Sequence, residues 1–146
     1  MKKQILIVVQ KLTVGGITSS LINLINYLNE NHPNELDIDL FTFSSLKQAN
    51  NIPENMNLMH GNKFLELSAT SFFDVLKSKN IANIFIRIIL MLYVRMVGSE
   101  AFYDKILKKH INTKEYDVAI SYSNDVPCDY FNQGTNRYVA DFTKAN

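Results

Sequence analysis

The sequence has few of the residues that build disulfide frameworks, metal centres or nucleic-acid-binding surfaces. Its single cysteine, Cys128, excludes an internal disulfide and a cysteine-cluster metal site, and it suits a reducing cytoplasm. The three histidines, His32, His60 and His110, are scattered and match no metal-binding motif, so we expect no metal. Fifteen basic residues against 14 acidic ones leave a net charge of +1, which favours no nucleic-acid partner.

The chain also shows no internal repeat, no low-complexity segment and no signal peptide. Its N-terminal apolar run is too short for the hydrophobic part of a signal peptide, and Gln10 and Lys11 end it. A length of 146 residues suits one domain, and 47% hydrophobic with 20% charged residues is typical of a globular protein. We therefore expect a single cytoplasmic domain over residues 1–146.

The most informative stretch is the N-terminal one, residues 4–29. Residues 5–9 are apolar without alternation, as expected of a strand covered on both faces of a parallel sheet. A polar loop follows and ends in Gly15-Gly16, after which residues 17–29 carry apolar side chains at helical spacing. A strand, a glycine turn and a helix in this order predict the opening of a βαβ unit.

The glycine pair has two interpretations. Glycine permits a tight turn and close packing of a helix on a strand. Alternatively, free backbone N–H groups at the helix start bind an anion, which makes Gly15, Gly16 and Thr18 candidate phosphate-binding residues. The turn contains neither G-x-G-x-x-G nor the lysine of a P-loop, which argues against dinucleotide and P-loop NTPase sites.

Further strands are expected at residues 36–43, 57–60, 116–122 and 136–140, and helices at 64–79, 81–97 and 99–111. Another helix is expected to begin near Val126, with Asn124 or Asp125 as its cap. The alternation predicts an α/β, Rossmann-like open sheet of at least five mostly parallel strands, with the first strand central and helices on both faces.

Asp37 and Asp39 stand two apart on the second expected strand and so share a face. Paired carboxylates can perform acid/base chemistry or bind a metal. Because exposed carboxylates are far more common, we interpret both as solvated residues at the entry of the strand.

Residues 81–97 form the most apolar segment, near the length of a membrane span but interrupted by Arg87 and Arg95. With Lys105, Lys108 and Lys109 of the next helix, these residues are candidates for a surface that faces an anionic membrane. The favoured interpretation is a helix buried on most sides, packed against the sheet with one narrow basic edge.

Two motifs together resemble the N-terminal domain of bacterial GT-B glycosyltransferases of retaining family 4. They are Gly15-Gly16-x-x-x-x-Leu21-x-Asn23-Leu24 after the first strand and YDVAIS at residues 116–121. The resemblance extends over all 146 residues and covers one half of a GT-B fold. It implies an acceptor-side domain, with the nucleotide-sugar domain and its E-x7-E motif absent from this chain.

The resemblance implies transfer of a sugar from a nucleotide-sugar donor to a polysaccharide or lipid-linked acceptor, without metal or cofactor, by a cytoplasmic enzyme that can be peripheral at the inner face of the membrane. It also implies that Asn124 and Asp125 face the interdomain cleft. Relatives often carry a histidine after the fifth strand, where this sequence has Phe142, so no catalytic residue is assigned.

Two other classes stay open. One is a non-catalytic, stand-alone Rossmann-like module that binds a phosphorylated ligand. The other is a flavodoxin-like or receiver-like regulatory domain, which the absence of an acidic cluster after the first strand disfavours. A second α/β domain with an E-x7-E motif in the parent reading frame would distinguish the enzyme from the binding module.

Overall fold

A computed structural model describes residues 2–13, 15–44, 53, 56–123, 125–126 and 129–145. Within these ranges the main sheet has four strands, all parallel, in the order β3-β2-β1-β5. The strands are β1 (Lys3–Lys11), β2 (Leu36–Ser44), β3 (Asn57–His60) and β5 (Val118–Ser121). The predicted α/β open parallel sheet with an interior first strand is therefore confirmed.

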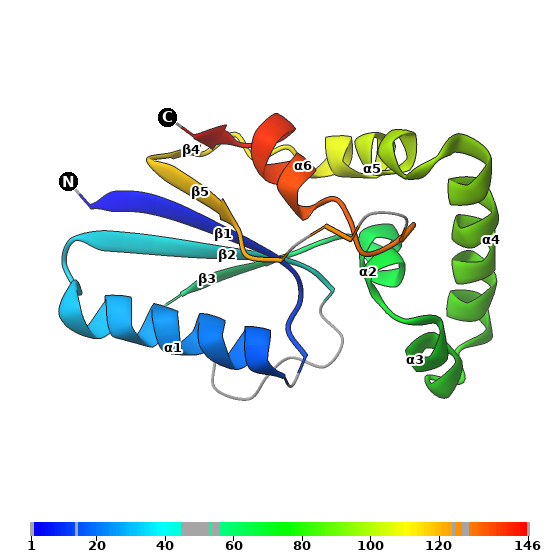
Figure 1. Cartoon of the computed structure of the whole chain (residues 1–146), viewed down its shortest axis with the longest axis horizontal. Helices are drawn as coiled ribbons and strands as arrows, with labels where there is room; N and C mark the ends of the chain where they lie inside the picture. The colour runs from blue at the N-terminus through cyan, green and yellow to red at the C-terminus, as the bar shows by residue number, and fades with distance from the viewer. Residues whose placement is uncertain are drawn as a thin grey trace.

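Both faces of β1 are buried, which explains its uninterrupted apolar sequence. Leu6 and Val8 point into one hydrophobic cluster, while Ile7 and Val9 point into another. The second cluster is closed by α1 (Gly16–Asn31), which lies along one face of the sheet in Figure 1. On the other face lie α5 (Ser99–Leu107) and α6 (Thr135–Asp141).

Three helices form a layer beyond the carboxyl ends of the strands. They are α2 (Lys63–Ala69), α3 (Phe72–Lys77) and α4 (Ile81–Val97), with α4 at the end of the molecule farthest from the N-terminus (Figure 1). A 3₁₀ turn, η1 (Lys108–His110), follows α5, and β4 (Glu115–Tyr116) pairs in parallel with β6 (Lys144–Ala145).

Several sequence predictions about individual elements are wrong. Residues 136–140 belong to α6 and are not a strand, so the main sheet has four strands in the described residues and not five. The helix expected at 64–79 is broken between Ala69 and Phe72, because Ser71 starts a new helix by accepting a hydrogen bond from the Asp74 N–H (3.2 Å). The strand expected at 116–122 is split between β4 and β5 at Asp117.

The predicted solvation of the paired aspartates is right for Asp37, whose side chain is half exposed, and wrong for Asp39, which is buried. Asp39 Oδ2 accepts hydrogen bonds from Lys114 Nζ (2.9 Å) and the Tyr116 hydroxyl (2.8 Å). Asn57 Nδ2 donates to the other carboxylate oxygen at 3.2 Å. These donors replace water around the charge, which makes its burial tolerable.

Candidate functional site at the carboxyl ends of β1 and β5

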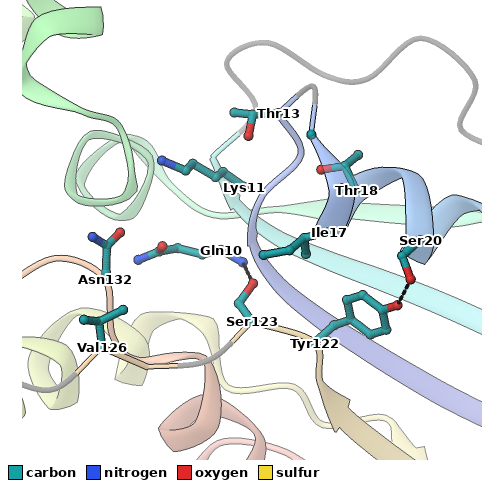
Figure 2. A pocket seen from close by; sticks show the side chains of 12 residues that line it. Gln10, Lys11, Thr13, Ile17, Thr18, Ser20, Tyr122, Ser123, Val126 and Asn132 are labelled. Carbon is teal, nitrogen blue, oxygen red and sulfur yellow. Dashed lines mark hydrogen bonds between the residues drawn. The ribbon is translucent and has the colours of Figure 1, made fainter.

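A cavity of about 690 Å³ opens where β1 and β5 end (Figure 2). One wall comes from the end of β1 and the start of α1, and the other from the segments that follow β5. The cavity is lined by Gln10, Lys11, Thr13, Gly15, Gly16, Ile17, Thr18, Ser20, Tyr122, Ser123, Val126 and Asn132.

The position of this cavity follows from the order of the strands. From β1 the chain passes through α1 to β2 on one side, and β5 later takes the position on the other side of β1. The connections that leave β1 and β5 therefore diverge. In open α/β sheets, ligands bind in the crevice that such a divergence creates at the carboxyl ends of the strands.

The glycine turn forms part of this wall, and its backbone geometry does not require glycine. Gly15 has φ 167° and ψ 172°, which is extended backbone open to any residue. A Cβ on Gly16 would meet nothing within 4 Å, and one on Gly15 would only touch the Thr13 carbonyl oxygen at 4.0 Å. Neither a left-handed φ nor close packing within the described chain requires glycine at these two positions, and the missing side chains leave the helix start open to the cavity.

The start of α1 presents free hydrogen-bond donors to the cavity. The helix has no side-chain cap and no acidic residue in its first turn, and its first backbone hydrogen bond runs from Ser19 N–H to the Gly15 carbonyl (3.0 Å). The N–H groups before Ser19 therefore have no intrahelical acceptor. Together with the helix dipole, they favour an anionic ligand.

Lys11 places a positive charge at the same edge. It is the last residue of β1, is half-buried, and lines both this cavity and an adjoining one of about 280 Å³. Thr13 lines both as well, and Figure 2 shows the Lys11 side chain extending from the end of β1 away from the start of α1. An anion in this cavity would therefore share it with a cationic side chain.

Polar contacts hold the opposite wall in place. The Gln10 backbone N–H donates to Ser123 Oγ (3.1 Å), and Gln10 Nε2 donates to the Phe131 carbonyl oxygen. Across the mouth of the cavity, the hydroxyls of Ser20 and Tyr122 share a hydrogen bond of 2.9 Å (Figure 2). This bond joins α1 to the segment after β5, so a ligand in the cavity would contact both walls.

Of the predicted binding residues, Gly15, Gly16 and Thr18 line the cavity together, and Asn124 lies outside the described residues. Asp125 does not line it. Its Oδ1 accepts hydrogen bonds from the Thr135 N–H (3.2 Å) and hydroxyl (2.9 Å), which fixes the start of α6. The helix expected to begin near Val126 is not seen at Val126 itself, residues 127 and 128 lie outside the described ranges, and the next described helix is α6.

Sequence reasoning missed several lining residues, Lys11, Gln10, Tyr122, Ser123 and Asn132. A positional signal for the first four was present, because each lies at or just beyond the end of a predicted strand. Asn132 carried no such signal. Its side-chain amide donates to Asp129, a contact in a loop that the sequence pattern does not specify.

The membrane-facing candidates divide into two groups. Arg95, Lys105, Lys108 and Lys109 are exposed. Arg87 is buried, with its guanidinium carbon 3.7 Å from the centre of the Phe131 ring, so it cannot face a membrane. Burial lowers the pKa of Arg87 to about 10, and its Nε and Nη1 have no hydrogen-bond partner among the described residues.

Phe142, where relatives often carry a histidine, is part of the core. It ends α6 as its C-cap residue, is buried in the hydrophobic core and stacks on Tyr138 with ring centres 6.5 Å apart. His110 is also structural, since its Nε2 accepts a hydrogen bond from the Asn62 N–H (3.3 Å), and burial lowers its pKa. In the described part of the chain, no three His, Cys, Asp or Glu residues gather as metal ligands would.

Comparison with known proteins adds no relative. No family model, no curated protein and no solved structure matches the chain. Among the described residues, no helix has the length and apolarity needed to cross a membrane.

Proposed function

We propose that this chain is the acceptor-side domain of a GT-B glycosyltransferase similar to family 4, which transfers a sugar from a nucleotide-sugar donor to a polysaccharide or lipid-linked acceptor in bacterial surface-glycan synthesis. The observation that carries the proposal is the cavity at the diverging ends of β1 and β5, lined by an uncapped helix start and Lys11. The resemblance of the glycine turn and of the YDVAIS strand to that family supports the same function.

The proposed role of this wall is electrostatic. Sugar transfer from a nucleotide sugar builds negative charge on the leaving diphosphate, and a lipid-linked acceptor carries phosphate as well. The N–H groups at Gly16 and the two following residues, with Lys11 in the lining of the same cavity, would stabilise either charge without a metal. The nucleotide sugar and the second domain would complete the site.

The first test uses the chain itself. Amide shifts in NMR spectra should move at residues 15–20 when pyrophosphate, a nucleoside diphosphate or a short polyprenyl phosphate is added. Lys11→Gln should weaken this binding because it removes the cation at the cavity wall. Shifts elsewhere, or none at millimolar ligand, would contradict a phosphate site at the glycine turn.

The second test is Gly16→Val in a protein that also contains the second domain. Because a Cβ at Gly16 meets open space, the variant should fold, while its side chain should block a phosphate. Turnover should then fall about 100-fold, the scale of losing one donor to a developing negative charge.

Ser19→Val is the matched control, since it adds a similar side chain to an exposed position of α1 that does not line the cavity. Equal activity of a folded Gly16→Val enzyme and this control would reject the site. Phosphate binding without any sugar transfer would instead support the non-catalytic binding module.

A further inference from the structure

The longest helix of the described chain, α4, turns an apolar face away from the protein. Its buried side chains are Arg87, Leu90 and Val94. The exposed ones include Phe85 at 64% and Met96 at 83% of full exposure. The full exposed apolar set on this face is Ile81, Phe85, Ile88, Ile89, Leu92 and Met96.

These residues form one continuous stripe, because an α-helix turns about 100° per residue. Ile81, Phe85, Ile88 and Leu92 follow at intervals of four, three and four, with Ile89 and Met96 beside them. We therefore define the α4 stripe as these six residues. Figure 1 shows α4 at the outer end of the molecule, with α2 and α3 on its inner side.

The sequence pattern predicts that the apolar sides of this helix pack in the protein and that a narrow basic edge is exposed. The structure differs in part, because Arg87 is buried with its guanidinium on the Phe131 ring and the α4 stripe is exposed, while Arg95 is exposed as expected. Among the described residues, none of the six side chains of the α4 stripe belongs to either hydrophobic cluster. Large exposed apolar patches of this kind mark interaction surfaces.

Positive charge borders the α4 stripe on both sides. Residues 77–99 contain four basic side chains and no acidic one. Arg95 is exposed one turn beyond Leu92, at one edge of the stripe. At the other edge Tyr93 follows Ile89 by one turn, and its hydroxyl accepts a hydrogen bond from the exposed Lys105 Nζ (3.2 Å).

We propose that α4 docks this protein on an anionic membrane surface, lying in the plane of the interface. The α4 stripe would enter the boundary between headgroups and acyl chains, and Arg95 and Lys105 would contact anionic headgroups. The positive charge beside the α4 stripe favours an anionic membrane over a second copy of the chain as its partner. Two α4 helices packed stripe to stripe would bring basic edges together with no acidic side chain of α4 to neutralise them.

Flotation of the protein with lipid vesicles tests this proposal independently of sugar transfer. Binding should be tighter to vesicles of phosphatidylcholine with phosphatidylglycerol than to phosphatidylcholine alone, and should weaken as salt is added. Phe85→Ser with Leu92→Ser should reduce the partition coefficient by about tenfold or more, because two large side chains no longer leave water. Arg95→Gln with Lys105→Gln should reduce the preference for the anionic vesicles.

Two controls test whether the position of the substituted residues on α4 matters, or only the loss of an exposed aromatic side chain or charge. Tyr27→Ser removes an exposed aromatic side chain from α1, which lies on the face of the sheet opposite α5 and α6. Lys3→Gln with Lys144→Gln removes two exposed charges that lie outside α4. Both controls should bind as the unaltered protein does, and circular dichroism should show every variant folded. The proposal fails if the anionic vesicles bind no protein or if the controls lose as much binding as the α4 variants. It also fails if light scattering shows a dimer without lipid that the α4 substitutions dissociate.

Discussion

Gly134 holds the start of α6 in a backbone conformation that disfavours any residue with a side chain. Its φ is +97°, and a Cβ there would lie 2.6 Å from Cδ1 of Tyr103. The Tyr103 ring cannot move aside easily, since it is 1% exposed and its hydroxyl donates to the Phe131 carbonyl oxygen (2.9 Å). Backbone strain and steric overlap with the Tyr103 ring therefore both oppose a side chain at position 134.

Replacing Gly134 by alanine should lower the free energy of unfolding by about 2–4 kcal/mol, the sum of backbone strain and overpacking. Urea denaturation measures this change. Gly98→Ala is the matched control, because Gly98 also has a positive φ (+82°) but a Cβ there meets nothing within 4 Å. If both variants lost the same stability, the contact with Tyr103 would contribute nothing.

The burial of two charged residues could not be predicted from the sequence. Asp39 and Arg87 are buried because their partners, Tyr116 and Phe131, come from distant parts of the chain. The local sequence pattern does not reveal those partners, so it predicts exposure for both residues, whereas both are buried. Gly15, Gly16 and Thr18 were predictable as cavity residues because a strand, a turn and a helix start are all local features.

Among the elements, strand and helix identity was predictable wherever the pattern was long, as in β1, α1 and α4. The short segment at residues 136–140, with two polar and three apolar residues, fits a strand or a helix equally well. The helix start is stabilised by Asp125, whose carboxylate accepts two hydrogen bonds from Thr135, ten residues later in the sequence. The break before α3 was readable in principle, since Ser71 and Asp74 have the spacing of a helix cap.

The start of α4 depends on a side-chain cap that can be removed alone. Asn80 Oδ1 accepts a hydrogen bond from the Asn83 N–H (3.2 Å). Asn80→Ala should lower the free energy of unfolding by about 1 kcal/mol, because that N–H then lacks an acceptor in the protein. The neighbouring change Asn83→Ala should be neutral or slightly stabilising, since alanine is the better helix former and the capping N–H remains. Chemical denaturation of both variants provides the comparison, and equal losses would rule out a capping role.

For the whole molecule, Asp39 joins parts that are remote in the sequence. Its carboxylate accepts hydrogen bonds from Asn57 in β3, from Tyr116 in β4 and from Lys114 just before β4. Burial and, to a lesser extent, the hydrogen bond to Asp39 raise the pKa of Tyr116. The contacts tie the β4–β6 pair to the main sheet on the face that Asp37 and Asp39 share.

Asp39→Ala should therefore destabilise the protein by about 1–3 kcal/mol, because it leaves the buried Tyr116 hydroxyl without its acceptor, while the exposed Asn57 and Lys114 can turn to water. Asp37→Ala is the control from the same strand face. Asp37 lies 3.7 Å from the same Lys114 nitrogen, but its side chain is half exposed, so the loss should stay below about 1 kcal/mol. Urea midpoints should separate the two variants clearly, and similar midpoints would show that the buried carboxylate adds no stability.

The contrast between β1 and α4 has a consequence for the order in which the protein opens. β1 is hydrogen-bonded to strands on both sides and covered on both faces, so its amide hydrogens should exchange with deuterium only when the whole domain unfolds. By contrast, α4 buries three side chains and can detach at a lower free-energy cost while the sheet stays closed. Lipid that covers α4 should therefore slow exchange in that helix and leave the slowest hydrogens, those of β1, unchanged.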